Sequence, residues 1–135
     1  MAKESGLGWS AFTVDDSSGS AKAIVNDVTG LQFSTPRAVQ DVTGLDKSAI
    51  ERLLLLSDFT VTANGVFNDA ADHAHAVFKT VPSTSVARTT TITVSGQTLA
   101  CEVLYTDYQL NRAQDGSFTW TAPGSLADGT VPTWS

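Results

Sequence analysis

Residues 88–103 alternate in polarity on either side of Ser95-Gly96, and this pattern constrains the fold more than any other part of the chain. Ser-Gly is suited to a two-residue hairpin turn. One face then pairs Val94 with Gln97, Ile92 with Leu99, Thr90 with Cys101 and Arg88 with Val103. The other face pairs Thr93 with Thr98, Thr91 with Ala100 and Thr89 with Glu102. A slip of one residue would mix the two faces, so we expect this register in an antiparallel hairpin.

A second hairpin is predicted around Asp115-Gly116. A two-residue turn would place Trp120 opposite Asn111. A three-residue loop places Trp120 opposite Leu110 and puts Gly116 at the left-handed position, so we prefer this register. Tyr105 and Tyr108 are three positions apart, so their side chains would point to opposite faces of one continuous strand. If both face the core, a bulge or break is expected between them.

The composition extends this pattern to the rest of the chain. The 135 residues include 14 Ser, 18 Thr and 13 Val but only 3 Glu, which favours strands and turns over helices. Further strands are predicted at residues 9–14, 21–25 and 58–67. We therefore expect a single domain over residues 1–135, mainly β, in which a β-sandwich or half-barrel packs against one α-helix.

The predicted helix spans residues 70–80. Asn68-Asp69 supplies an N-cap, and Pro82 follows the end of the segment. Its apolar positions recur at helical spacing. These positions are Ala71, Ala74, Val77 and Phe78, and we expect the helix to pack on the sheet through Ala74, Val77 and Phe78.

Residues 26–57 are rich in turn signals, and we expect a long inter-strand loop that contributes to assembly. Within it, residues 48–58 carry a capping-box pattern that favours a helix, but the four-leucine block lacks a polar face. We favour extended structure there and keep the helix as the alternative. The block is expected at contacts between subunits: Leu53, Leu54, Leu55 and Leu56. Residues 1–8 are expected to form a flexible N-terminal arm.

The charge balance excludes several classes of protein. Eight Lys and Arg residues against fourteen Asp and Glu residues give a net charge of −6, which argues against a basic surface for nucleic acid or anionic lipid. No apolar segment approaches the ~20 residues of a membrane span. No signal-peptide pattern is present, and a single cysteine excludes an intrachain disulfide. A soluble protein made inside a cell is expected.

Evidence for catalysis is sparse. His73 and His75 lie about 200° apart on a helix and so cannot share a metal ion there. No nucleophile-elbow, P-loop or zinc-protease motif occurs. Asp15-Asp16 is interpreted as a solvated turn and Cys101 as a buried, inert thiol. We therefore predict no catalytic residue, no metal and no cofactor.

Several stretches resemble the major tail tube proteins of long-tailed bacteriophages. These stretches are residues 41–49 (DVTGLDKSA), 51–53 (ERL), 59–69 (FTVTANGVFND), 75–78 (HAVF) and 128–134 (DGTVPTW). The resemblance extends over most of the chain from about residue 20 to residue 135.

The resemblance implies a structural subunit of a virion tail, made in the cytoplasm of a bacterial host. Such subunits form stacked hexameric rings, and their inner strands close a β-barrel between subunits. Double-stranded DNA then passes through the tube as cargo without specific binding. The other implied partners are the tape-measure and tail-terminator proteins, and no membrane is involved.

A neutral or acidic polar wall would let DNA slide, whereas a basic wall would hold its phosphates. We expect the channel to be lined by the polar face of the first hairpin: Thr89, Thr91, Thr93, Thr98 and Glu102. Two other polar faces compete, one with Thr60, Thr62 and Asn64 and one with Asp107, Gln109 and Asn111. The alternative functions are a decoration, adhesive or carbohydrate-binding β-module of a virion, and a small enzyme.

Overall fold

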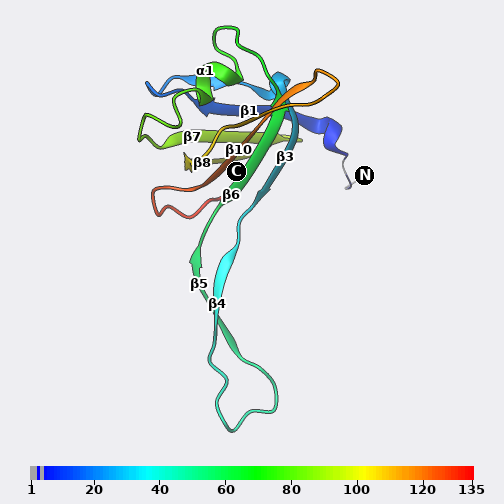
Figure 1. Cartoon of the computed structure of the whole chain (residues 1–135). Helices are drawn as coiled ribbons and strands as arrows, with labels where there is room; N and C mark the ends of the chain where they lie inside the picture. The colour runs from blue at the N-terminus through cyan, green and yellow to red at the C-terminus, as the bar shows by residue number, and fades with distance from the viewer. Residues whose placement is uncertain (1–2, 4) are drawn as a thin grey trace.

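The structure is a computed structural model that describes Lys3 and residues 5–135 (Figure 1). It confirms a mainly β chain with one short α-helix. In chain order the elements are η1 (Gly6–Gly8), β1 (Trp9–Asp15), β2 (Ala21–Ala23), η2 (Val25–Asp27), β3 (Val28–Ser34), β4 (Arg37–Asp41), β5 (Arg52–Ser57), β6 (Thr60–Val66), α1 (Ala74–Phe78), β7 (Arg88–Val94), β8 (Gln97–Tyr105), β9 (Gln109–Arg112) and β10 (Phe118–Leu126).

Eight strands form one antiparallel sheet in the order β2-β1-β7-β8-β10-β6-β3, with β9 also paired to β10. Where a β-sandwich or half-barrel was expected, the structure has a single large sheet that bends over its own inner face. Trp9 on β1 meets Phe33 on β3, with their ring centroids 5.9 Å apart. Within the described residues no barrel closes in one chain, because β2 and β3 remain separate edges.

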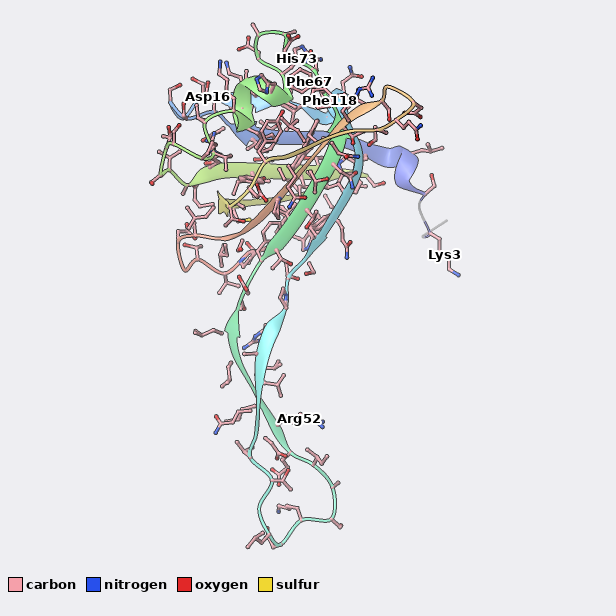
Figure 2. The ribbon with its side chains drawn as sticks, viewed as in Figure 1. Lys3, Asp16, Arg52, Phe67, His73 and Phe118 are labelled. Carbon is pink, nitrogen blue, oxygen red and sulfur yellow. The ribbon has the colours of Figure 1, made fainter. Side chains whose placement is uncertain are left out.

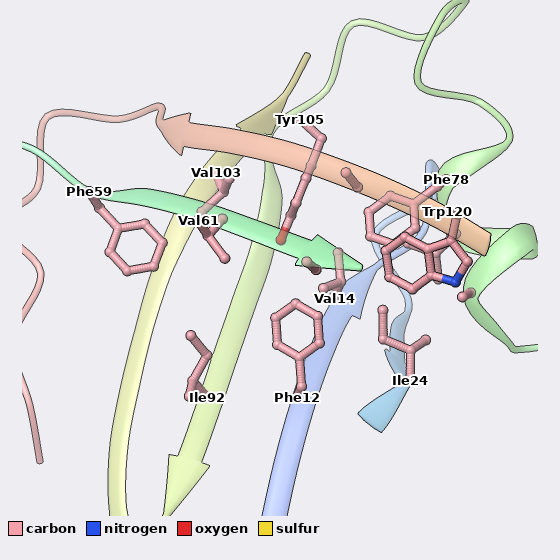
Figure 3. Close-up of a cluster of buried hydrophobic side chains, with 14 of the residues drawn as sticks. Phe12, Val14, Ile24, Phe59, Val61, Phe78, Ile92, Val103, Tyr105 and Trp120 are labelled. Carbon is pink, nitrogen blue, oxygen red and sulfur yellow. The ribbon is translucent and has the colours of Figure 1, made fainter. Parts of the chain in front are cut away.

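The core lies between the two halves of this bent sheet (Figure 3). Phe12 and Ile92 come from β1 and β7, whereas Val61 and Trp120 come from β6 and β10, and all four are at most 2% exposed. Burying a large apolar side chain contributes about 1.5–3 kcal/mol to stability. The sheet therefore bends because both halves carry apolar residues on the same face.

The hairpin of β7 and β8 has the register predicted from the sequence, from Arg88 opposite Val103 to Val94 opposite Gln97. The turn residues Ser95 and Gly96 have φ values of 49° and 78°. Both values are positive, as a type I′ turn requires. Ile92, Leu99 and Val103 are buried on the predicted apolar face.

The second hairpin also confirms the preferred register, with Trp120 opposite Leu110. Gly116 has a φ of 97°, which a residue with a side chain rarely adopts. β8 and β9 pair with the same edge of β10 on either side of residues 106–108. Between them the register shifts by one residue, so the break predicted between Tyr105 and Tyr108 is present.

The helix is shorter than predicted, since α1 begins at Ala74 rather than near residue 70. Asp72 has a φ of 66°, which interrupts the helical path just before α1. Asn68 caps a local turn instead, accepting a hydrogen bond from the Ala70 backbone N–H at 3.1 Å. Ala71 of the apolar stripe is exposed, whereas Ala74, Val77 and Phe78, the three expected packing positions, are fully buried.

Residues 26–57 are not the irregular loop expected from their turn signals. β3 pairs with β6 inside the large sheet, whereas β4 and β5 pair with each other. The β4–β5 hairpin extends far from the body of the molecule (Figure 1), and we call residues 37–57 the arm. β5 confirms the extended alternative for the leucine block. β3 escaped prediction because its partner lies about thirty residues further along the chain.

At the N-terminus, Gly6–Gly8 form the 3-10 turn η1, and the Gly8 carbonyl accepts a hydrogen bond from the Ser95 N–H at 2.9 Å. Of the expected N-terminal arm, residues 1, 2 and 4 lie outside the described part of the chain. None of the helices in the described part is long and apolar enough to cross a membrane.

Candidate assembly and channel surfaces

Side chains project from both faces of the arm (Figure 2), and its leucines are exposed to solvent. Leu53 and Leu55 alternate with Leu54 and Leu56 along β5, and their exposed fractions are 52%, 41%, 61% and 85%. Val39 on the paired strand is also half exposed. Burial of these side chains would be favourable, and their own chain does not provide it. The arm is therefore a candidate protein–protein surface.

The arm is held in shape by local hydrogen bonds. At its base, the Arg37 guanidinium donates to the Leu55 carbonyl from both Nε and Nη2, at 3.1 and 2.9 Å. At its tip, the Asp41 carboxylate accepts hydrogen bonds from the Thr43 hydroxyl and N–H, which lower the pKa of Asp41. The Thr43 hydroxyl in turn accepts from the Glu51 N–H at 2.8 Å. These contacts order the tip and leave Leu45 and Ile50 exposed beyond it.

The predicted channel residues on β7 and β8 share one strand face, but none of them is fully exposed. Thr89, Thr91, Thr93, Thr98 and Glu102 are all half-buried. Thr89 donates a hydrogen bond to Glu102, and Thr93 and Thr98 are bonded at 3.2 Å. The C-terminal residues cover the edge of β8, where Ser135 and Thr98 exchange two backbone hydrogen bonds of 2.9 Å. This edge of β8 is therefore already paired by its own chain, and the Thr face beside it is only half exposed.

The two competing faces lie on one surface of the sheet, which is broader and more open. The outer surfaces of β3, β6, β10 and β9 are in register, because directly paired residues point to the same side. The polar residues of this outer face are Gln32, Ser34, Thr60, Thr62, Asn64, Gln109, Asn111, Thr119, Thr121 and Ser125. All of them except Thr121 are exposed. Gly30, Val66 and Pro123 complete it, so none of its strand positions carries a charge. Asp107, in the break just before β9, is the charged neighbour of this face, and its carboxylate accepts a hydrogen bond from Gln109 Nε2 at 2.9 Å.

The N-terminus of α1 is held by a carboxylate from a distant part of the chain. Asp27, at the end of η2, is 4% exposed. Its carboxylate accepts hydrogen bonds from the Ala74 backbone N–H at 3.1 Å and from Asn68 Nδ2 at 2.8 Å, and it lies 3.1 Å from His73 Nδ1. A carboxylate at this end also complements the helix dipole. Asp27 thereby replaces the predicted cap at Asn68-Asp69.

The other end of α1 is held by a buried arginine. Arg88 on β7 is 1% exposed, and its guanidinium donates to the Val77 carbonyl, the Asp15 carbonyl and the Thr80 hydroxyl at 2.9–3.1 Å. Burial lowers the pKa of Arg88 from its high ordinary value. A cation beside the last carbonyls of a helix is favourable. Arg88 therefore joins β1, α1 and the segment after it.

The remaining polar candidates have structural roles. His75 Nδ1 lies 3.1 Å from the Tyr108 hydroxyl, and its ring packs on Phe67, with centroids 4.8 Å apart. The Asp16 carboxylate closes the 16–20 turn through the Ser18 and Ser20 N–H groups, as expected for a solvated turn. Cys101 is half-buried rather than buried, and burial raises its pKa to about 11. Over the described residues, no group of three or more His, Cys, Asp or Glu side chains is placed to hold a metal ion.

Sequence reasoning missed the roles of Asp27 and Arg88. Arg88 carried a signal, because the predicted hairpin register placed a charged residue on an apolar face. Asp27 carried none, since it precedes the helix it caps by more than forty residues. Gly65 also escaped notice. A Cβ at this position would lie 1.9 Å from the Asp27 carbonyl oxygen, so only glycine lets η2 approach β6.

Comparisons with known proteins find similar folds among solved structures. No protein-family model matches the chain, and a search of curated proteins finds no match. Among solved structures, a chain from the tail of an empty GTA particle, with helical refinement and C6 symmetry, superposes with a TM-score of 0.71 at 18% identity, covering 98% of both chains. A chain from the virion of a native gene transfer agent (GTA) particle gives a TM-score of 0.70 at 13% identity, covering 98% of this chain and 99% of the other.

At these identities the similarity lies in the fold. It extends over almost the whole length of each compared chain. The chain therefore has the fold of a protein found in the C6-symmetric tail of a GTA particle.

Proposed function

We propose that this chain is a structural subunit of a phage-type tail tube, which assembles into stacked hexameric rings. The observation that carries the proposal is the end-to-end similarity of fold to a chain of a C6-symmetric tail. The sequence resemblance to major tail tube proteins of long-tailed bacteriophages points independently to the same function. In this role the protein acts in the virion tail, after synthesis in the cytoplasm of a bacterial host.

The arm supports this proposal because its exposed leucines need a partner. In a tube, the arm of one subunit lies against neighbouring subunits, and the leucines leave water on assembly. Inner strands from neighbouring subunits close a β-barrel, which removes the open sheet edges of the single chain. The tape-measure and tail-terminator proteins are the other partners that this function requires.

The tube carries double-stranded DNA as passing cargo. The net charge of −6 and the uncharged outer face suit this role, because neither attracts phosphates. A basic channel would bind DNA and slow its passage, with an effect that weakens as salt rises. No membrane and no cofactor take part.

The main alternative is a decoration, adhesive or carbohydrate-binding module of a virion. A carbohydrate site needs an exposed aromatic platform, but Trp120 is 1% exposed, and Trp134, at 46% exposed, is a single ring that packs at a tilt against Phe33 with centroids 5.9 Å apart. An enzyme is less favoured still. One surface groove of about 340 Å³ has no titratable side chain in its lining, and in another of about 330 Å³ His75 Nδ1 already lies 3.1 Å from the Tyr108 hydroxyl.

Negative-stain electron microscopy of the purified protein tests the proposal. We expect rings or tubes of constant bore, with sixfold symmetry in end-on views. Sedimentation over a range of concentrations gives the assembled fraction. A protein that stays monomeric at every concentration, or that binds a glycan array as a monomer, would overturn the tail-tube function.

A further inference from the structure

β3 is an open edge of the large sheet, and it lacks the features that protect edge strands in monomers. It pairs with β6 on one side, and no strand of the described chain pairs with the other. Its seven residues, VTGLQFS, include no charged residue and no proline. Proteins commonly shorten or charge an exposed edge, since an unguarded one pairs with other chains.

β2, at the opposite end of the sheet, is protected in this way. It has only three residues, and Lys22 lies at its centre. The Lys22 ammonium group is 2.8 Å from a carboxylate oxygen of Asp72 and 4.0 Å from one of Asp16. The contrast indicates that β3, and not β2, is the edge available for pairing.

β9 is the second available edge. It pairs with β10 on one side, no other strand of residues 5–135 pairs with it, and its four residues are all exposed. Arg112 is the single charged residue in β3 and β9, and it lies at the end of β9. β3, β6, β10 and β9 thus form a four-stranded antiparallel unit with an open strand at each side.

The directions of these two edges are complementary. Each strand of the unit is antiparallel to the next, so β3 and β9 run in opposite directions. When a second copy is placed beside the first by rotation, β9 of that copy therefore meets β3 in antiparallel orientation. A head-to-tail contact of this kind generates a closed ring if the rotation closes.

We propose that neighbouring copies of this chain join through antiparallel pairing of β3 in one copy with β9 in the next. This inference rests on the proposed tail-tube function and names the strands that form the junction. The junction makes the uncharged outer face continuous from copy to copy, and closure turns that face toward the channel. DNA then meets Thr, Ser, Asn and Gln side chains of β3, β6, β9 and β10 in place of the half-buried face of β7 and β8.

Cysteine cross-linking in a Cys101→Ser background tests the junction. Gln32→Cys on β3 and Asn111→Cys on β9 place thiols on the same face at the two edges, and a short bis-maleimide tolerates a small offset in register. We expect a ladder of covalent oligomers on a denaturing gel. Each single cysteine variant should give at most a trace of dimer. Ser34→Cys with Gln109→Cys is a second pair, for use if the first variant melts at a lower temperature than its parent.

The matched control joins Ala21→Cys on β2 with Asn111→Cys, and we expect no ladder from it. Microscopy of the same samples separates the two proposals. Tubes without a β3–β9 ladder, or with a β2–β9 ladder, would overturn the junction and leave the tail-tube function standing. A β3–β9 ladder without rings or tubes would support the junction and contradict the tube. The absence of both would overturn both.

Discussion

At the scale of single residues, two charged side chains hold a helix that is too short to be stable by itself. A five-residue helix is well below the length at which an isolated helix forms in water. Asp27 binds the first turn of α1 and Arg88 the last, so η2 supplies a carboxylate at the positive end and β7 a guanidinium at the negative end. Both groups are buried and hydrogen-bonded, which makes their removal costly.

Asp27→Ala is expected to lower the free energy of unfolding by about 2–4 kcal/mol, because it leaves the Ala74 N–H and the Asn68 amide without their acceptor. Urea denaturation followed by circular dichroism measures this change. Asp69→Ala is the matched control, since Asp69 is exposed and should cost about 0.5 kcal/mol or less. Equal effects of the two substitutions would show that the local sequence caps the helix.

Cys101 should react slowly with iodoacetamide at pH 8. Its pKa is raised to about 11, so the thiolate that attacks the reagent is scarce at that pH. Mass spectrometry of the folded protein should show alkylation accelerating as the pH rises toward 11, up to the limit at which the protein stays folded. A free cysteine peptide, whose rate levels off near its ordinary pKa of about 8.5, serves as the comparison. If Cys101 of the folded protein reacts as fast as the peptide at pH 8, its half-buried position in the structure is contradicted.

At the scale of elements, α1 and the two hairpins meet in one aromatic cluster. Phe78 on α1 packs against Tyr105 and Trp120, with ring centroids 5.1 and 5.2 Å apart. The Trp120 indole N–H donates to the Val66 carbonyl at 3.0 Å, which satisfies its polar atom within the core. The helix thus covers the end of the core where the β8–β9 break lies.

Phe78→Ala is expected to lower the free energy of unfolding by about 3–5 kcal/mol, because it removes a fully buried ring and leaves a cavity. Thermal and urea denaturation measure the loss. Val131→Ala, at a side chain that is 59% exposed, is the control and should change stability by about 0.5 kcal/mol or less. A folded Phe78→Ala variant with unchanged stability would contradict the core position.

At the scale of the whole molecule, the body and the arm differ in how they bury their apolar side chains. The body buries its apolar face within one chain, whereas the arm exposes leucines on both sides of a two-stranded hairpin. An isolated two-stranded hairpin is marginal in water. The arm therefore suits a protein whose final environment is an assembly.

Leu54→Asp combined with Leu56→Asp should abolish assembly while leaving the body folded. Both side chains are more than 60% exposed, so the unfolding free energy should change by about 0.5 kcal/mol or less. Sedimentation and negative-stain microscopy measure assembly, and thermal denaturation measures folding. Val131→Asp introduces a similar charge at an exposed apolar position outside the arm and should still assemble. Tubes formed by the double variant would show that the arm leucines are dispensable.

The elements that could be predicted from the sequence are those set by near neighbours in the chain. Both hairpin registers follow from a turn and the alternation around it, since a two-residue or three-residue loop leaves little freedom of pairing. The buried positions Ala74, Val77 and Phe78 follow from helical spacing in the same way.

The tertiary structure decided the features that depend on distant residues. Asp27 reaches α1 and Arg88 reaches Asp15 across more than forty residues, and no local pattern records such contacts. Likewise, several strands offered a polar face, and their spacing could not rank them. Only the folding of the C-terminal residues along β8, and of β3 beside β6, left one broad face uncharged and open to solvent. Periodicity tells which residues share a face, whereas only packing tells what covers it.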